Sequence, residues 1–121
     1  GEMVDLIASC HLGLSVCRDD AGVSLKAAMP TKIGEFLASG RPVVVNPGLC
    51  DAATLLGRHQ CGVLYGSSLS GRTVETVDLV EERLADALTP ARCRGLAEDH
   101  FDLEEGVERL IEIYNFAYRN R

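Results

Sequence analysis

Apolar residues near the start of the chain recur at helical spacing and then give way to a short apolar run at 12–16. Two further runs of strand length follow at 42–45 and 61–65, and the first of these is rich in valine. The sequence therefore predicts three short strands. It also predicts an opening helix whose apolar positions are Met3, Leu6, Ile7 and Cys10.

Helical spacing returns between the predicted strands. Residues 31–39 form a predicted helix, which Gly40 ends as a left-handed cap. Asp51 is expected to cap a short helix at 51–56. The segment at 17–30 carries charges, glycine and a terminal proline, so we expect a loop there.

The last part of the chain is predicted to be mainly helical. Apolar residues at 74–88 fall near one face of a helix, and Thr89 and Pro90 then suit the cap and first position of another short helix. A final helix is expected to start at Asp102, because Asp102 and Glu105 have the spacing of a capping box.

Helices that alternate with strands imply a parallel sheet, because parallel strands need crossover connections, which cover the faces of the sheet. A complete doubly wound nucleotide-binding domain has two such halves, and only one is visible here. We therefore expect an α/β fold, a Rossmann-like half-domain with a parallel sheet flanked by helices, in which residues 1–121 form a single partial domain. Without upstream strands, the strand at 12–16 becomes an unpaired edge, so the fragment is expected to self-associate.

Composition narrows the classes of partner. The 12 Lys and Arg residues against 18 Asp and Glu residues give a net charge of −6, which repels a nucleic-acid backbone. No apolar stretch approaches the roughly 20 residues of a transmembrane helix. The five cysteines, at positions 10, 17, 50, 61 and 93, form no CxxC pair, and the histidines are scattered. We therefore expect no metal site, and reduced thiols in a cytoplasmic protein.

Polar residues of the helix at 31–39 are the candidates for ligand binding. Lys32 and Glu35 share a face, and Thr31 lies near the same side. A helix start at the carboxyl side of a sheet suits a diphosphate, to which Thr31 could add a hydroxyl and Lys32 a cation. The carboxylate of Glu35 could accept hydrogen bonds from ribose hydroxyls. Gly34 indicates close approach of a ligand or another backbone, or tight packing on the sheet. Spacing alone favours the simpler interpretation that Lys32 and Glu35 belong to a solvated helix face with a weak local charge pair.

The most specific signal is the run MPTKIGEFLASGRPVVV at 29–45. It resembles the donor-binding segment of retaining-type GT-B glycosyltransferases of the glycosyltransferase group 1 family. The segments ASCHLGLSV at 8–16 and FDLEEGVERLIEIY at 101–114 resemble that family's helix-to-strand step and its closing helix. The resemblance implies that the chain is a fragment of the carboxy-terminal, nucleotide-sugar-binding lobe. The upstream strands of that lobe and the acceptor-binding amino-terminal lobe would then lie outside these residues.

The resemblance implies that the parent is an enzyme that transfers a glycosyl unit from a nucleoside diphosphate sugar to an unknown acceptor, with no cofactor. Glu35 matches the glutamate that contacts the ribose in that family, and Thr31 and Lys32 match residues beside the diphosphate. The family motif has a second glutamate, eight positions before the one that Glu35 matches. This chain has Ala27 there, so that second glutamate is absent or displaced. The fragment is not expected to catalyse by itself, and no catalytic residue is identified.

Two other classes of function stay open. A receiver-like phosphoacceptor domain uses an acidic pair after its first strand, which Asp19 and Asp20 would supply, although a polar loop explains the same residues. That fold also needs five strands and an acid after the third, where this chain has Gly-Ser-Ser at 66–68. A domain that has lost activity and serves nucleotide sensing or interaction would fit the alanine at position 27.

Overall fold

The computed structural model describes residues 1–17, 22–65 and 72–120. Its strands form one parallel sheet in the order β1-β2-β3. They are β1 (Gly13–Ser15), β2 (Val43–Val45) and β3 (Gly62–Leu64). In the central strand, Val44 pairs with Leu14 on one side and with Val63 on the other. The three predicted strands and their parallel pairing are confirmed, and each strand lies inside its predicted range.

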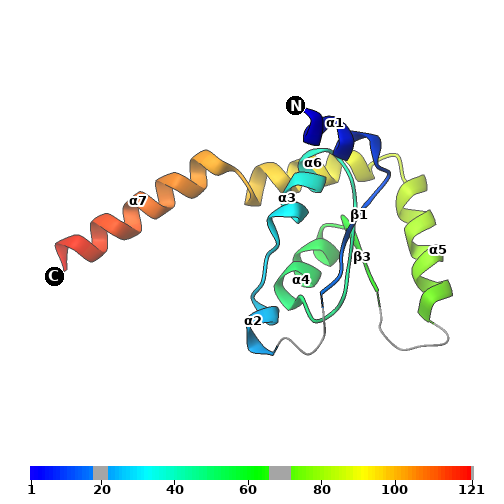
Figure 1. Ribbon diagram of the computed structural model, residues 1–121, viewed down its shortest axis with the longest axis horizontal. Helices are drawn as coiled ribbons and strands as arrows, with labels where there is room; N and C mark the ends of the chain where they lie inside the picture. Colours follow the sequence, from blue (N-terminus) through cyan, green and yellow to red (C-terminus); the bar gives the residue numbers. More distant parts are fainter. Residues whose placement is uncertain (18–21, 66–71, 121) are drawn as a thin grey trace.

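Helices flank the sheet on both faces, as the α/β prediction requires. In chain order they are α1 (Glu2–Ser9), α2 (Val23–Lys26), α3 (Thr31–Ala38), α4 (Cys50–Arg58), α5 (Arg72–Ala85), α6 (Thr89–His100) and α7 (Leu103–Arg119). In Figure 1, α3 and α4 lie on one side of the sheet and α5 lies on the other. Helix α6 packs along α3 and therefore belongs to the same layer.

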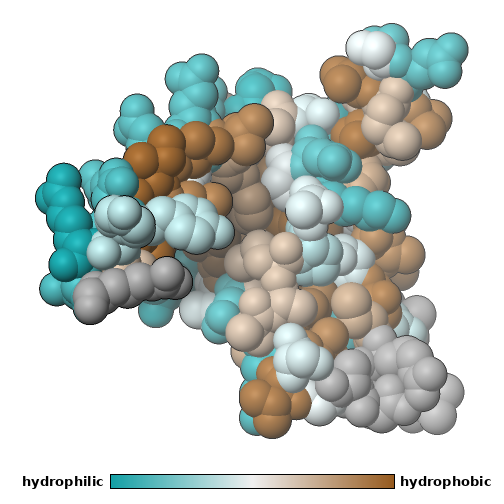
Figure 2. Space-filling view, turned by 60° about the vertical axis from the view of Figure 1, so that its left-hand side comes forward, coloured by the Kyte–Doolittle hydropathy of each residue, from teal (hydrophilic) through white to brown (hydrophobic). Residues whose placement is uncertain are grey.

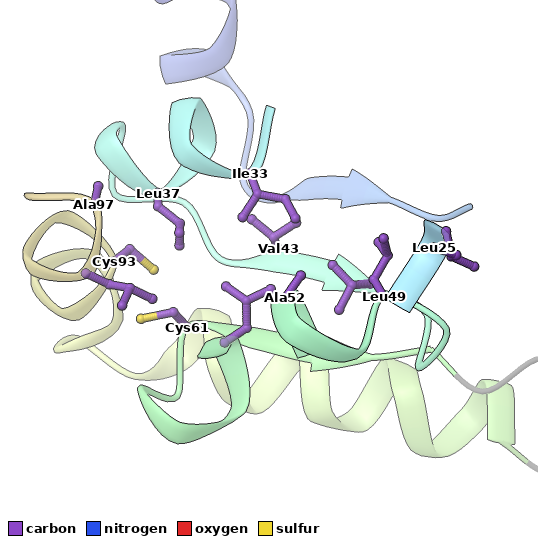
Figure 3. Packing of buried hydrophobic residues seen from close by; sticks show 12 residues of the cluster. Leu25, Ile33, Leu37, Val43, Leu49, Ala52, Cys61, Cys93 and Ala97 are labelled. Atoms are coloured by element: carbon purple, nitrogen blue, oxygen red, sulfur yellow. The ribbon is translucent and has the colours of Figure 1, made fainter. Parts of the chain in front are cut away.

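The hydrophobic core lies between one face of the sheet and the helices α3, α4 and α6 (Figure 3). Val43 and Val45 belong to this core, whereas Val44 lies near Val80 of α5 on the opposite face. Strand residues alternate between the two faces of a sheet, so the valine run fills both faces of the central strand. The helices contribute fully buried side chains from Ile33, Leu37, Leu56 and Leu96.

The segment at 17–30 is not the continuous loop that its composition predicts. Helix α2 forms within it, and Leu25 of that helix is buried in the core. A helix of four residues is too short to show helical periodicity in the sequence. The glycine and the charged residues around α2 therefore predict a loop, although a short helix forms there.

Two predicted helix starts are wrong by one or two residues. Helix α4 has Leu49 as its N-cap, so Asp51 lies inside the first turn instead of capping it. Leu49 is fully buried and its N–H donates to the carbonyl of Asn46 at 3.1 Å, which leads the preceding turn directly into the helix. Helix α6 has Leu88 as its N-cap and Thr89 as its first residue. It also runs for 12 residues, longer than the short helix predicted there.

Two predicted caps are confirmed. Gly40 follows α3 in the left-handed conformation with φ 73°, and its N–H donates to the carbonyl of Leu37 at 2.8 Å. Asp102 caps α7 by accepting a hydrogen bond from the N–H of Glu105 at 2.9 Å. These signals depend on a few neighbouring residues, which is why the sequence alone could locate them.

Helix α7 extends away from the rest of the molecule (Figure 1) and has no buried residue. Its exposed apolar side chains include Val107, Leu110, Ile111, Ile113, Tyr114 and Phe116. Among the residues that the structure describes, no helix is both long and apolar enough to cross a membrane.

Candidate functional site

Helix α3 turns its apolar side chains into the core and leaves its candidate polar side chains outside. Ile33 and Leu37 are fully buried, whereas Thr31, Lys32 and Glu35 are all exposed. Pro30 occupies the N-cap and offers no side-chain hydrogen bond to the first turn. The N–H groups of Thr31 and Lys32 therefore have no side-chain cap and can donate to an acceptor from outside, such as an anion, whereas the N–H of Ile33 donates to the carbonyl of Pro30 at 2.9 Å.

A groove of about 640 Å³ lies over the packed helices α3 and α6 and reaches the start of α7. Figure 2 shows a hollow between the body of the molecule and the projecting arm of α7. The groove is lined by Thr31, Gly34, Glu35 and Ala38 of α3, by Arg94, Ala97 and Glu98 of α6, and by Phe101, Asp102 and Leu103 at the start of α7. Two of the three predicted site residues thus share one concave surface.

Gly34 forms part of the groove floor because α6 ends directly against it. A Cβ atom at this position would lie 2.8 Å from Cδ1 and 3.1 Å from Cγ of Phe101. The close neighbour of this mid-helix glycine is therefore an aromatic side chain. The sequence predicts a ligand, another backbone or the sheet as this neighbour. The nearest protein atoms instead belong to Phe101, and close approach of a ligand stays a prediction.

Acidic side chains outnumber basic ones along the groove. Glu35, Glu98 and Asp102 supply three carboxylates, against the single guanidinium of Arg94. One carboxylate oxygen of Asp102 already accepts a hydrogen bond, the one that caps α7. Such a lining suits hydroxyl donors, for example those of a sugar, better than it suits phosphate groups.

Lys32 lies outside the groove, although it follows Thr31 directly. One residue along a helix turns the side chain by about 100°, so Lys32 points away from the α6 side. Figure 1 places α2 beside the carboxyl end of β1, with residues 27–30 leading from α2 to the start of α3. The three predicted residues therefore divide into a hydroxyl and a carboxylate in the groove and a cation outside it.

At the carboxyl end of the sheet, the structure reveals a polar residue whose role the sequence did not predict. Asn46 follows β2 and is 1% exposed. Its Oδ1 accepts a hydrogen bond from the N–H of Cys17 at 2.9 Å, which joins the ends of β1 and β2. The sequence indicated only a turn at Asn46, because a buried amide and a turn-forming amide look alike in one sequence.

Other sequence-based candidates have different outcomes. Ala27 is the C-cap of α2 and its side chain is exposed. Asp19, Asp20 and residues 66–68 lie outside the described residues. Over the ranges that the structure describes, no group of three or more His, Cys, Asp or Glu side chains is arranged to hold a metal ion.

Comparisons of the chain with protein-family models, with curated proteins and with solved structures give no match.

Proposed function

We propose that this chain is the donor-binding part of a glycosyltransferase that uses a nucleoside diphosphate sugar. The observation that carries the proposal is the position of Thr31, Lys32 and Glu35, all exposed at the start of a helix whose first N–H groups are not capped by a side chain. Helices that begin in this way bind phosphate groups through their N–H groups and positive end. The run at 29–45, with its resemblance to glycosyltransferase group 1 enzymes, supports the same reading.

In this proposal the three residues have separate roles. Glu35 accepts hydrogen bonds from the ribose hydroxyls, because an ionised carboxylate offers two acceptor oxygens. Lys32, outside the groove, supplies positive charge to the diphosphate, and Thr31 supplies a hydroxyl. Neutralising the diphosphate as it leaves lowers the barrier to sugar transfer. Contacts to the transferred sugar must come from elsewhere, since Ala27 has no polar side chain.

The groove adds a physical reason to place the ribose beside Glu35. Its apolar wall, formed by Ala38, Ala97 and Phe101, can cover a sugar or base, and Glu35 and Glu98 can accept hydrogen bonds from hydroxyl groups. A diphosphate would lie nearer to the start of α3 and to Lys32, away from the acidic lining. In this arrangement the diphosphate lies at the Lys32 side of α3, and the ribose hydroxyls lie at the Glu35 side.

The test is a titration of the protein with uridine, guanosine and adenosine diphosphates, followed by NMR chemical shifts or calorimetry. Glu35→Gln should weaken binding about 10-fold to 150-fold, corresponding to the roughly 1.5–3 kcal/mol of a charge-assisted hydrogen bond. Glu81→Gln, on the exposed surface of α5, is the matched control and should leave the affinity unchanged. Unchanged affinity in Glu35→Gln, with an unchanged melting temperature, would show that Glu35 belongs to a solvated helix face.

A second candidate function is nucleotide binding without sugar transfer, which the exposed Ala27 favours. The two functions differ in one measurement. The protein that carries this chain together with an acceptor-binding lobe should release nucleoside diphosphate from a donor sugar if it is a transferase. Tight nucleotide binding without any such release would identify a binding domain.

A further inference from the structure

Two cysteines from distant parts of the sequence meet in the core. Cys61 lies between the end of α4 and the start of β3, and Cys93 lies in the second turn of α6. Both are fully buried. In Figure 3 the two sulfur atoms point toward one another across the core. The remaining cysteines of the chain, Cys10, Cys17 and Cys50, are at least partly exposed.

The backbone holds each thiol in place. Gln60, just before Cys61, has a φ of 53°, and the N–H of Cys61 donates to the carbonyl of Leu56 at 3.0 Å. These features form a helix-ending motif with Gln60 in the left-handed position. The backbone of Cys93 is held differently, by its place inside the regular helix α6. The two thiols therefore project toward each other from two segments of regular backbone.

The surroundings give the two thiols different acidities. A hydrogen bond from the Cys93 side chain lowers the pKa of Cys61, and the charges of Arg92 and Arg83 act in the same direction against the opposing effect of burial. The pKa of Cys93 is raised by its hydrogen bond to Cys61 and by burial. Cys61 is thus the more acidic of the two thiols, which suits it to be the attacking sulfur.

We propose that Cys61 and Cys93 are a redox pair that forms a reversible disulfide when the protein meets a peroxide. The Cys61 thiolate attacks one oxygen of hydrogen peroxide, the O–O bond breaks, and hydroxide takes up a proton and leaves as water. The Cys93 thiol then attacks the resulting sulfenic acid, and the hydroxyl group leaves as a second water with the proton from Cys93. Two thiols and one peroxide give one disulfide and two waters, so two electrons pass from sulfur to oxygen.

Formation of this bond would tie α6 to the junction of α4 and β3. Helix α6 also forms one wall of the groove, through Arg94, Ala97 and Glu98. A cross-link at Cys93 would therefore hold that wall against the sheet. Because both sulfurs are buried, we expect oxidation to require local opening and to be slower than modification of the exposed Cys50.

The test is treatment of the folded protein with hydrogen peroxide, then denaturation, alkylation of free thiols and digestion with trypsin. The expected product is a peptide covering residues 59–72 joined to residues 93–94, which dithiothreitol separates again. The joined form should melt several degrees higher than the reduced form, because the bond restricts the unfolded chain. Cys50→Ser, which removes the exposed thiol, should leave the linked product in place.

Cys93→Ser serves as the matched variant and should lose the linked peptide while its Cys61 is oxidised further or alkylated. If that variant fails to fold, the digestion of the unsubstituted protein still decides the matter. Recovery of Cys61 and Cys93 as free thiols, under conditions that oxidise Cys50 completely, would show that they are only core side chains. Disulfides that link either of them to another cysteine would equally overturn the proposal.

Discussion

Gly34 has two opposing effects on the stability of the protein, one through helix propensity and one through packing. Within a helix, glycine is less favourable than alanine by about 1 kcal/mol, so its presence in α3 needs a reason. The reason here is the ring of Phe101, which occupies the space where a Cβ atom would stand. The half-buried ring packs against the core cluster, and the Cβ atom of Phe101 also lies 3.3 Å from the same point, so part of the contact remains when the ring rotates.

We predict that Gly34→Ala destabilises the protein by about 1–2 kcal/mol, because the cost of overpacking exceeds the gain in helix propensity. Gly95 provides the control, since it lies in α6 and a Cβ atom there would meet nothing within 4 Å. Gly95→Ala should therefore stabilise by about 0.5–1 kcal/mol. Urea unfolding of both variants measures the difference. Equal stabilisation by the two substitutions would mean that Phe101 moves aside without cost.

Sequence reasoning identified the glycine as unusual but could not name its neighbour. Phe101 is distant in the sequence and meets Gly34 only because α6 packs along α3. The same limit applies to the groove, where Thr31 and Glu35 were predicted as site residues but Arg94 and Glu98 were not. A helix face can be read from its own spacing, whereas the partner of that face depends on the tertiary fold.

At the scale of elements, the short connection between α5 and α6 depends on one acidic residue. The carboxylate of Asp86 accepts hydrogen bonds from the guanidinium of Arg92 and, at 2.9 Å, from the N–H of Leu88. These bonds hold the pKa of Asp86 below its ordinary value, with Arg92 the larger cause. Asp86 therefore stabilises the folded protein above its ordinary pKa, and this contribution is lost as the pH falls below about 4.

We predict that Asp86→Asn lowers the stability measurably at pH 7 and makes a smaller difference at pH 3, below the ordinary pKa of an aspartate, where part of this contribution is already lost. The effect should be small and should decrease with added salt, because the ion pair is solvent-accessible. Asp78→Asn, on the exposed surface of α5, is the control. Thermal or urea unfolding at the two pH values gives the comparison, and a loss of equal size at both would contradict this origin.

Elements with strong local signals were predicted well, and those determined by packing were not. The valine run of β2 and the Asp102 cap of α7 can be recognised from neighbouring residues alone. Helix α2 has only four residues, and its single buried side chain, Leu25, is held by contacts with the core. The start of α4 likewise follows from burial of Leu49 and not from the capping preference of Asp51.

At the scale of the whole molecule, one edge of the sheet stands out. In the part of the chain that the structure describes, β1 pairs only with β2 and has no strand on its other side. Helix α5 lies against β3, so the face of the sheet beneath β1 has less cover, and Leu14 is 66% exposed. An unpaired edge beside exposed apolar side chains is a template for pairing with another chain.

We therefore predict that the 121-residue chain self-associates through the β1 edge. Sedimentation velocity over a range of concentrations should show dimers or larger species, and Leu14→Lys should raise the dissociation constant about 10-fold or more, because a charge on an edge strand opposes pairing. The exposed apolar side chains of α7 offer a competing surface, and Leu110→Lys tests it separately. Association that Leu110→Lys abolishes and Leu14→Lys leaves intact would assign the contact to α7. A strict monomer at every concentration would show that the open edge of β1 is protected by its own short length and twist.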